Sequence, residues 1–130
     1  MLDRTVEHEK AATRGEQFDI AHEAWAADYP DPSSFLNVLL DGRRIQATNN
    51  VNLAYFNDAA YNRKLSQAAG KTGQERLTAY ANLDADIMKN RAPWAPYLSL
   101  NQRIFVSPSV GCFTYSAVYG TTNLAAVCKK

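Results

Sequence analysis

The feature that most limits how this chain can fold is the scarcity of strand candidates, which long helical stretches separate. Residues 17–25 alternate between two faces, and this period of two predicts a first strand. Pro30 and Pro32 then stop any ladder, because neither residue has a backbone N–H to donate. The other strand candidates lie near the end of the chain, at residues 95–107, 112–120 and 123–130, the last of which also fits a helical turn. So few strands make a poor closed sheet, which predicts a piece of a larger α/β domain.

Four segments have the composition and the end signals of helices. They are residues 2–13, residues 32–40, a segment from Asn57 or Asp58 to Gly70, and a segment from Thr72 to about Arg91. Thr72 and Glu75 form a T-x-x-E capping box at the start of the last one. Its expected buried stripe includes one carboxylate, Asp84, among Leu77, Tyr80, Ala81, Ile87 and Met88.

Charge and hydropathy exclude several classes of partner. The chain has 130 residues, the length of one ordinary domain, and a net charge of +1. That charge gives no electrostatic case for binding nucleic acid or an anionic membrane. There is no long apolar run, so no membrane span is predicted. The first ten residues, MLDRTVEHEK, are charged throughout and do not have the apolar core of a signal peptide.

The sequence predicts neither a metal site nor a cofactor, and it does not favour an enzyme. Cys112 and Cys128 are far from both histidines in the sequence, whereas a metal site needs three or four ligands at closer spacing. The two cysteines are therefore either inert buried thiols or one disulfide. Asp28 and Asp31 could form a catalytic carboxylate pair. However, the chain contains no nucleophile elbow, phosphate-binding glycine loop or zinc motif.

Three stretches together resemble a known family: FDIAHEAWAADYPDPSSFL, YFN before a helix, and RLTAYANLDADIMKNRAPWAPYLSLNQRIFVSPSVG. They are similar to the C-terminal part of the family 5 extracellular solute-binding proteins, the oligopeptide, dipeptide and nickel binding components of ABC importers. The most specific element is W-x-x-D-Y-P-D-P, from Trp25 to Pro32. The closing VYGTTNLAAVCKK resembles members in which a late cysteine pair, here Cys112 and Cys128, can occur.

The resemblance implies a fold, partners and a location. The fold would be α/β, a partial lobe of a two-lobed periplasmic-binding-protein-like clamshell of type II, cluster C. Residues 1–130 would form the C-terminal part of a lobe, and residues 104–130 would return towards the hinge or the other lobe. The full-length protein would be extracytoplasmic, in the periplasm or as a cell-surface lipoprotein. It would bind a peptide or another small solute and deliver it to ABC permease subunits.

The resemblance also implies roles for individual residues. Asp28 matches a position that holds the α-amino group of a peptide. Trp25 matches a position that lines a pocket for a side chain of the ligand. Tyr29 could either face the ligand or be a structural residue of the loop. From the residues alone, a tryptophan at position 25 is more often a core residue than a pocket wall, and Asp28 could bond backbone N–H groups of the loop. Asp31 is better explained as an Asx-turn residue or a helix cap. A ligand sensor on the same fold and a small carboxylate-pair enzyme are the alternative functions.

Overall fold

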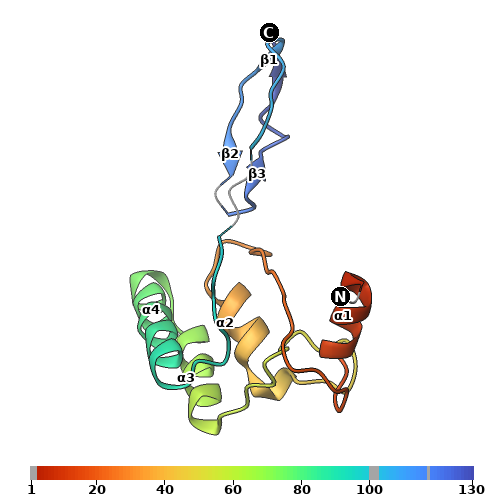
Figure 1. Cartoon of the computed structure of the whole chain (residues 1–130). Helices are drawn as coiled ribbons and strands as arrows, with labels where there is room; N and C mark the ends of the chain where they lie inside the picture. Colours follow the sequence, from red (N-terminus) through yellow and green to blue (C-terminus); the bar gives the residue numbers. More distant parts are fainter. Residues whose placement is uncertain (1–2, 100–102, 117) are drawn as a thin grey trace. The chain divides into compact units, whose positions relative to one another are not determined.

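The helices lie between Arg4 and Asn90, and the short strands lie between Val110 and Lys129 (Figure 1). The computed structural model describes residues 3–99, 103–116 and 118–130. It divides the chain into two units. Unit 1 comprises Met1–Trp25 and Asp31–Ala95, and unit 2 comprises Ala26–Pro30 and Pro96–Lys130.

The helices of unit 1 begin close to where the sequence predicts them. They are α1 (Arg4–Ala11), α2 (Ser33–Leu40), α3 (Ala59–Ala69) and α4 (Gly73–Asn90), with a 3-10 turn η1 (Gly42–Arg44) after α2. Asp58 caps α3 as expected, because its carboxylate accepts hydrogen bonds from two backbone N–H groups of the first turn. The predicted capping box of α4 is wrong. The Thr72 side chain makes no capping bond, and Glu75 pairs with Lys71 instead.

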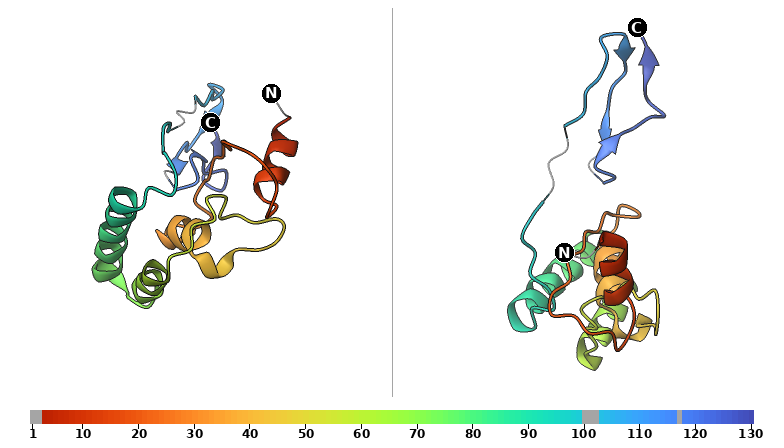
Figure 2. Two further views of the ribbon diagram at one scale, coloured as in Figure 1. Left: turned by 60° about the horizontal axis from the view of Figure 1, so that its bottom comes forward. Right: turned by 45° about the vertical axis from the view of Figure 1, so that its right-hand side comes forward.

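The core of unit 1 lies between α2, α3 and α4, which are side by side in Figures 1 and 2. Its fully buried apolar side chains come from all three helices and are Leu40, Leu65, Tyr80 and Ile87. Burial of this apolar area is the main stabilising contribution to such a helical layer. The predicted stripe of α4 is partly wrong, since the buried face is Tyr80, Leu83 and Ile87, and Asp84 is exposed.

The predicted strand at residues 17–25 is also wrong. These residues form no ladder, and Ile20 is 89% exposed. The backbone N–H of His22 instead donates to the Glu7 carboxylate of α1, at 2.8 Å. An alternating pattern forms a strand only where a second strand accepts its hydrogen bonds. The structure gives this segment a helix side chain as a partner in place of a ladder.

Unit 2 contains two short antiparallel ladders. Strand β1 (Val110–Gly111) pairs with β4 (Cys128–Lys129), and β2 (Tyr115–Ser116) pairs with β3 (Thr121–Thr122). A disulfide joins Cys112 to Cys128, with a Cα–Cα distance of 5.3 Å, so the pair is not two free thiols. Among the described residues of this unit, only Gly111 is buried.

The strand predictions for this part of the chain are partly confirmed. Strand β2 lies in the candidate at 112–120, and β4 lies in the candidate at 123–130. The described residues of the candidate at 95–107 form no strand. Residues 100–102 and 117, which belong to these candidates, lie outside the described residues.

Candidate ligand-binding segment

The indole N–H of Trp25 has a hydrogen-bond partner, and the side chain is partly exposed. The indole Nε1–H donates to the backbone oxygen of Ser34 in the first turn of α2, at 2.9 Å. Ser34 is fully buried, whereas Trp25 is 37% exposed. A tryptophan in this state is not a core residue, and its N–H has a partner, as amphipathic aromatic side chains require. Its exposed ring surface is compatible with a pocket wall.

The other two candidate residues, Asp28 and Tyr29, belong to unit 2. Both are exposed, and Tyr29 retains 43% of its accessible surface. The sequence therefore places three candidate residues within five positions, and the structure assigns them to different units.

Asp31 has the structural role that the sequence predicts. Its Oδ1 accepts hydrogen bonds from the backbone N–H of Ser33, at 2.9 Å, and from the Ser33 hydroxyl, at 2.5 Å. The backbone oxygen of Asp31 accepts from the N–H of Ser34 at 3.0 Å. These contacts form an Asx turn that begins α2.

The partner that sequence reasoning missed is Arg76 of α4. Its Nε donates to Asp31 Oδ2 and its Nη2 to Asp31 Oδ1, both at 2.7 Å. This two-bond fork is the strong form of an arginine–carboxylate pair. Hydrogen bonds from Arg76 outweigh the opposing effect of burial and hold the pKa of Asp31 well below its usual range, with a further contribution from Ser33. The pair joins residues 45 positions apart, so no local pattern could reveal it.

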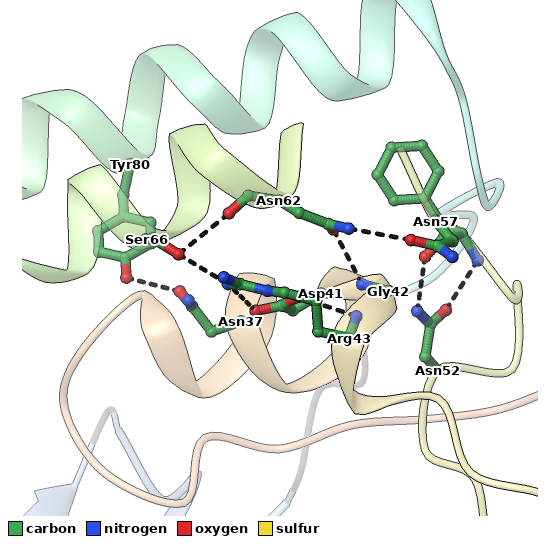
Figure 3. Close-up of polar contacts among 10 residues, drawn as sticks. Asn37, Asp41, Gly42, Arg43, Asn52, Asn57, Asn62, Ser66 and Tyr80 are labelled. Carbon is green, nitrogen blue, oxygen red and sulfur yellow. Dashed lines mark hydrogen bonds and ion pairs between the residues drawn. The ribbon is translucent and has the colours of Figure 1, made fainter. Parts of the chain in front are cut away.

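The loop after α2 is fixed by a network of side-chain amides, drawn in Figure 3, of which Asn52 and Asn62 are buried. Asn62 of α3 accepts from the backbone N–H of Gly42 at 3.0 Å and donates to Asn57 Oδ1 at 2.9 Å. Asn52 is fully buried and bonds both backbone polar groups of Phe56. Asn50 donates to the backbone oxygen of Asn52 at 2.7 Å, so both asparagines hold the backbone of this loop.

Two surface hollows in unit 1 are lined by other residues than the candidates. One, of about 260 Å³, is lined by α3 and α4 residues including Lys64, Leu83 and Asp86. The other, of about 360 Å³, is lined by residues of the loop from Arg43 to Val51. In the part of the chain that the structure describes, no three His, Cys, Asp or Glu side chains are grouped to hold a metal ion. No helix among residues 3–99, 103–116 and 118–130 has the length and apolarity needed to cross a membrane.

Comparison with curated proteins identifies relatives of the chain. It is 31% identical over 98 residues to the periplasmic oligopeptide-binding protein OppA of Escherichia coli (strain K12), covering 75% of this chain and 17% of OppA. It is 30% identical over 91 residues to the periplasmic murein peptide-binding protein MppA of the same strain, covering 70% of this chain and 16% of MppA. The chain belongs to the family 5 extracellular solute-binding proteins.

A third relative widens the range of ligands within the family. The chain is 32% identical over 103 residues to heme-binding protein A of Haemophilus influenzae (strain ATCC 51907 / DSM 11121 / KW20 / Rd), covering 75% of this chain and 18% of that protein. The chain thus spans less than a fifth of each of these solute-binding proteins. All three are binding proteins by name, which agrees with the prediction that this chain is not an enzyme. No protein-family model and no solved structure matches the chain.

Proposed function

We propose that the chain is the C-terminal part of the solute-binding component of an ABC importer, and that its solute is a peptide. The observation that carries the proposal is its similarity to two proteins named for oligopeptides and murein peptides. The complete protein is then a two-lobed clamshell of type II, cluster C. Residues 1–130 belong to one lobe, and residues 104–130 return towards the hinge or the other lobe.

In this proposal Asp28 anchors the α-amino group of the peptide. A cation that loses water in a closed cleft requires a charged partner with hydrogen bonds. Trp25 supplies an apolar wall for a side chain of the ligand, and its half-exposed ring supports that role. Tyr29, also exposed, is the third candidate for contact with the ligand.

The complete protein works outside the cytoplasm, in the periplasm or as a cell-surface lipoprotein, and delivers its solute to ABC permease subunits. The periplasmic location named for two relatives supports this placement. A ligand sensor that does not transport is the alternative on the same fold. Permease and ATPase genes beside the gene for this protein distinguish import from sensing.

Heme is the second candidate ligand, because one relative with 32% identity is named for heme binding. Titration of the complete protein with heme, followed by absorbance, and with a tripeptide, followed by calorimetry, separates the two. Peptide binding without heme binding supports the proposal. Saturable heme binding without peptide binding contradicts the proposal and makes heme the ligand.

The role of Asp28 is tested by Asp28→Ala in the complete protein, measured by titration calorimetry with a tripeptide. Losing one partner of a buried charge pair costs about 2 kcal/mol or more, which is roughly a thirtyfold loss of affinity. Asp19→Ala is the matched control, because Asp19 is another exposed carboxylate. Unchanged affinity of the Asp28 variant rules out the amine anchor.

The 130-residue chain by itself is expected to bind peptides weakly or not at all, because the proposed cleft requires two lobes. Titration of the isolated chain with the same tripeptide checks this expectation. Submicromolar binding to the isolated chain contradicts the two-lobed site.

A further inference from the structure

Residues 17–25 have the side-chain alternation of a strand, and their two faces differ in what they contact. Phe18 and Ile20 share one face by this alternation and are 42% and 89% exposed. The opposite face includes Trp25, whose indole donates to the backbone oxygen of Ser34 in α2 at 2.9 Å. One face of the segment is therefore turned to the helices of unit 1, and the other presents large apolar side chains to water.

The backbone of this segment offers hydrogen-bonding groups along one edge. No residue that the structure describes forms a hydrogen bond with the backbone N–H or C=O groups of residues 18–21. The N–H of His22 donates to the Glu7 carboxylate of α1 at 2.8 Å. Alternate residues of an extended segment direct their backbone groups to the same edge. The edge that carries the His22 N–H therefore faces α1, and the opposite edge carries Asp19 and Ala21.

An edge of this kind fits a second strand, and the relatives indicate where that strand comes from. A row of backbone groups without partners, next to exposed apolar side chains, is a template for strand pairing. Residues 18–21 contain no proline or glycine that would block a ladder. The chain covers only 17% of OppA and 18% of heme-binding protein A. More than four fifths of such a protein therefore lies outside the matched part and can supply the neighbouring strand.

We propose that residues 17–24 pair, in the complete protein, with a strand contributed by the part of the polypeptide outside these 130 residues. The neighbouring strand bonds the edge that carries Asp19 and Ala21, and apolar side chains from the same part cover Phe18 and Ile20. The 130-residue chain forms no ladder here because that neighbour is missing. The inference rests on the proposed function only in that the complete protein is longer than this chain, and it does not depend on which solute is bound.

Amide hydrogen exchange of the complete protein without solute tests the pairing, by mass spectrometry with fragmentation that reports single residues. The amides of Asp19 and Ala21 should exchange about a hundredfold slower than in an unstructured peptide of the same sequence. The amide of Asn62, bonded to Asp58 in α3, is the internal control for a folded lobe. Exchange of Asp19 and Ala21 at the unstructured rate, with Asn62 protected, overturns the proposal. Protection found only where light scattering shows a dimer assigns the neighbour to a second copy and overturns it as well.

The apolar cover is tested by Ile20→Ser in the complete protein, measured as the midpoint of urea unfolding. The midpoint should fall, because the substitution removes an apolar side chain that the rest of the protein buries. Ile20→Leu is the matched control, since it keeps an apolar side chain of the same size, and it should stay close to wild type. An unchanged midpoint in Ile20→Ser means that Ile20 remains exposed and contradicts the cover. Neither experiment uses a solute, so failure of the peptide proposal leaves both results readable.

Discussion

Replacing both cysteines by serine should unfold the strand pairs of unit 2 and leave the helices of unit 1 intact. The reason is the small amount of burial in unit 2, in which Gly111 is the only described residue that is buried. Each of its ladders pairs two residues with two. An isolated two-stranded hairpin is at best marginally stable in water. Unit 2 therefore depends on the Cys112–Cys128 crosslink to limit its unfolded ensemble.

The size of the effect follows from the sequence separation of 16 between the two cysteines. Closing a loop of that length removes unfolded-state entropy worth about 3 kcal/mol at 25 °C. A free energy of this size corresponds to roughly a hundredfold change in the opening equilibrium. Because the remaining ladder is marginal, the double variant should spend most of its time with the strands unpaired.

Amide hydrogen exchange followed by NMR measures this change at single residues. The N–H of Asn123 donates to Thr114 at 3.0 Å, and that of Lys130 to Ser109 at 2.9 Å. Both amides should exchange about a hundredfold faster in the double variant. The amide of Asn62, bonded within the first turn of α3, is the internal control. Unchanged protection at Asn123 and Lys130 would refute the reasoning.

Three further predictions concern the stability of unit 1, measured by urea unfolding and helix circular dichroism. Leu65→Ala removes a fully buried side chain and should cost about 2–5 kcal/mol; a loss below about 1 kcal/mol contradicts the packing. Gly42→Ala should cost about 1–3 kcal/mol, because its Cβ would lie 2.1 Å from Asn57 Oδ1. Gly70→Ala, whose Cβ meets nothing closer than 3.7 Å, is its control, and equal effects would refute the clash. Because the folded state lowers the pKa of Asp31, its ionised carboxylate stabilises the fold at pH values above its ordinary pKa of 3.8. The free energy of unfolding of wild type should therefore exceed that of Asp31→Asn by less and less as the pH falls below 3.8. A difference that does not change with pH contradicts this prediction.

Helix positions were readable from the sequence because their signals are local. The Asp58 cap and the stop at Gly70 bound α3 without reference to the rest of the chain. The buried face of α4 was less predictable, since tertiary contacts select Leu83 and leave Leu77 half exposed. Strands depend on partners, and for this reason the alternation of residues 17–25 misled the prediction.

The candidate site shows the same division between local and distant information. The Asx turn at Asp31 involves neighbours only two or three positions away, so composition and the following proline indicate it. The attachment of that turn to Arg76 spans 45 positions and required the structure. The two cysteines are an intermediate case. Their spacing allowed either thiols or a disulfide, and the fold of unit 2 brings them together.

A crystal structure of the complete protein with a bound tripeptide tests the central proposal most directly. The proposal predicts a carboxylate oxygen of Asp28 about 2.7–2.9 Å from the α-amino nitrogen, the usual length of a charge-assisted bond. It also predicts the exposed ring face of Trp25 against a ligand side chain. A peptide whose amine is bound by another carboxylate, with Asp28 bonded to loop backbone, would contradict it.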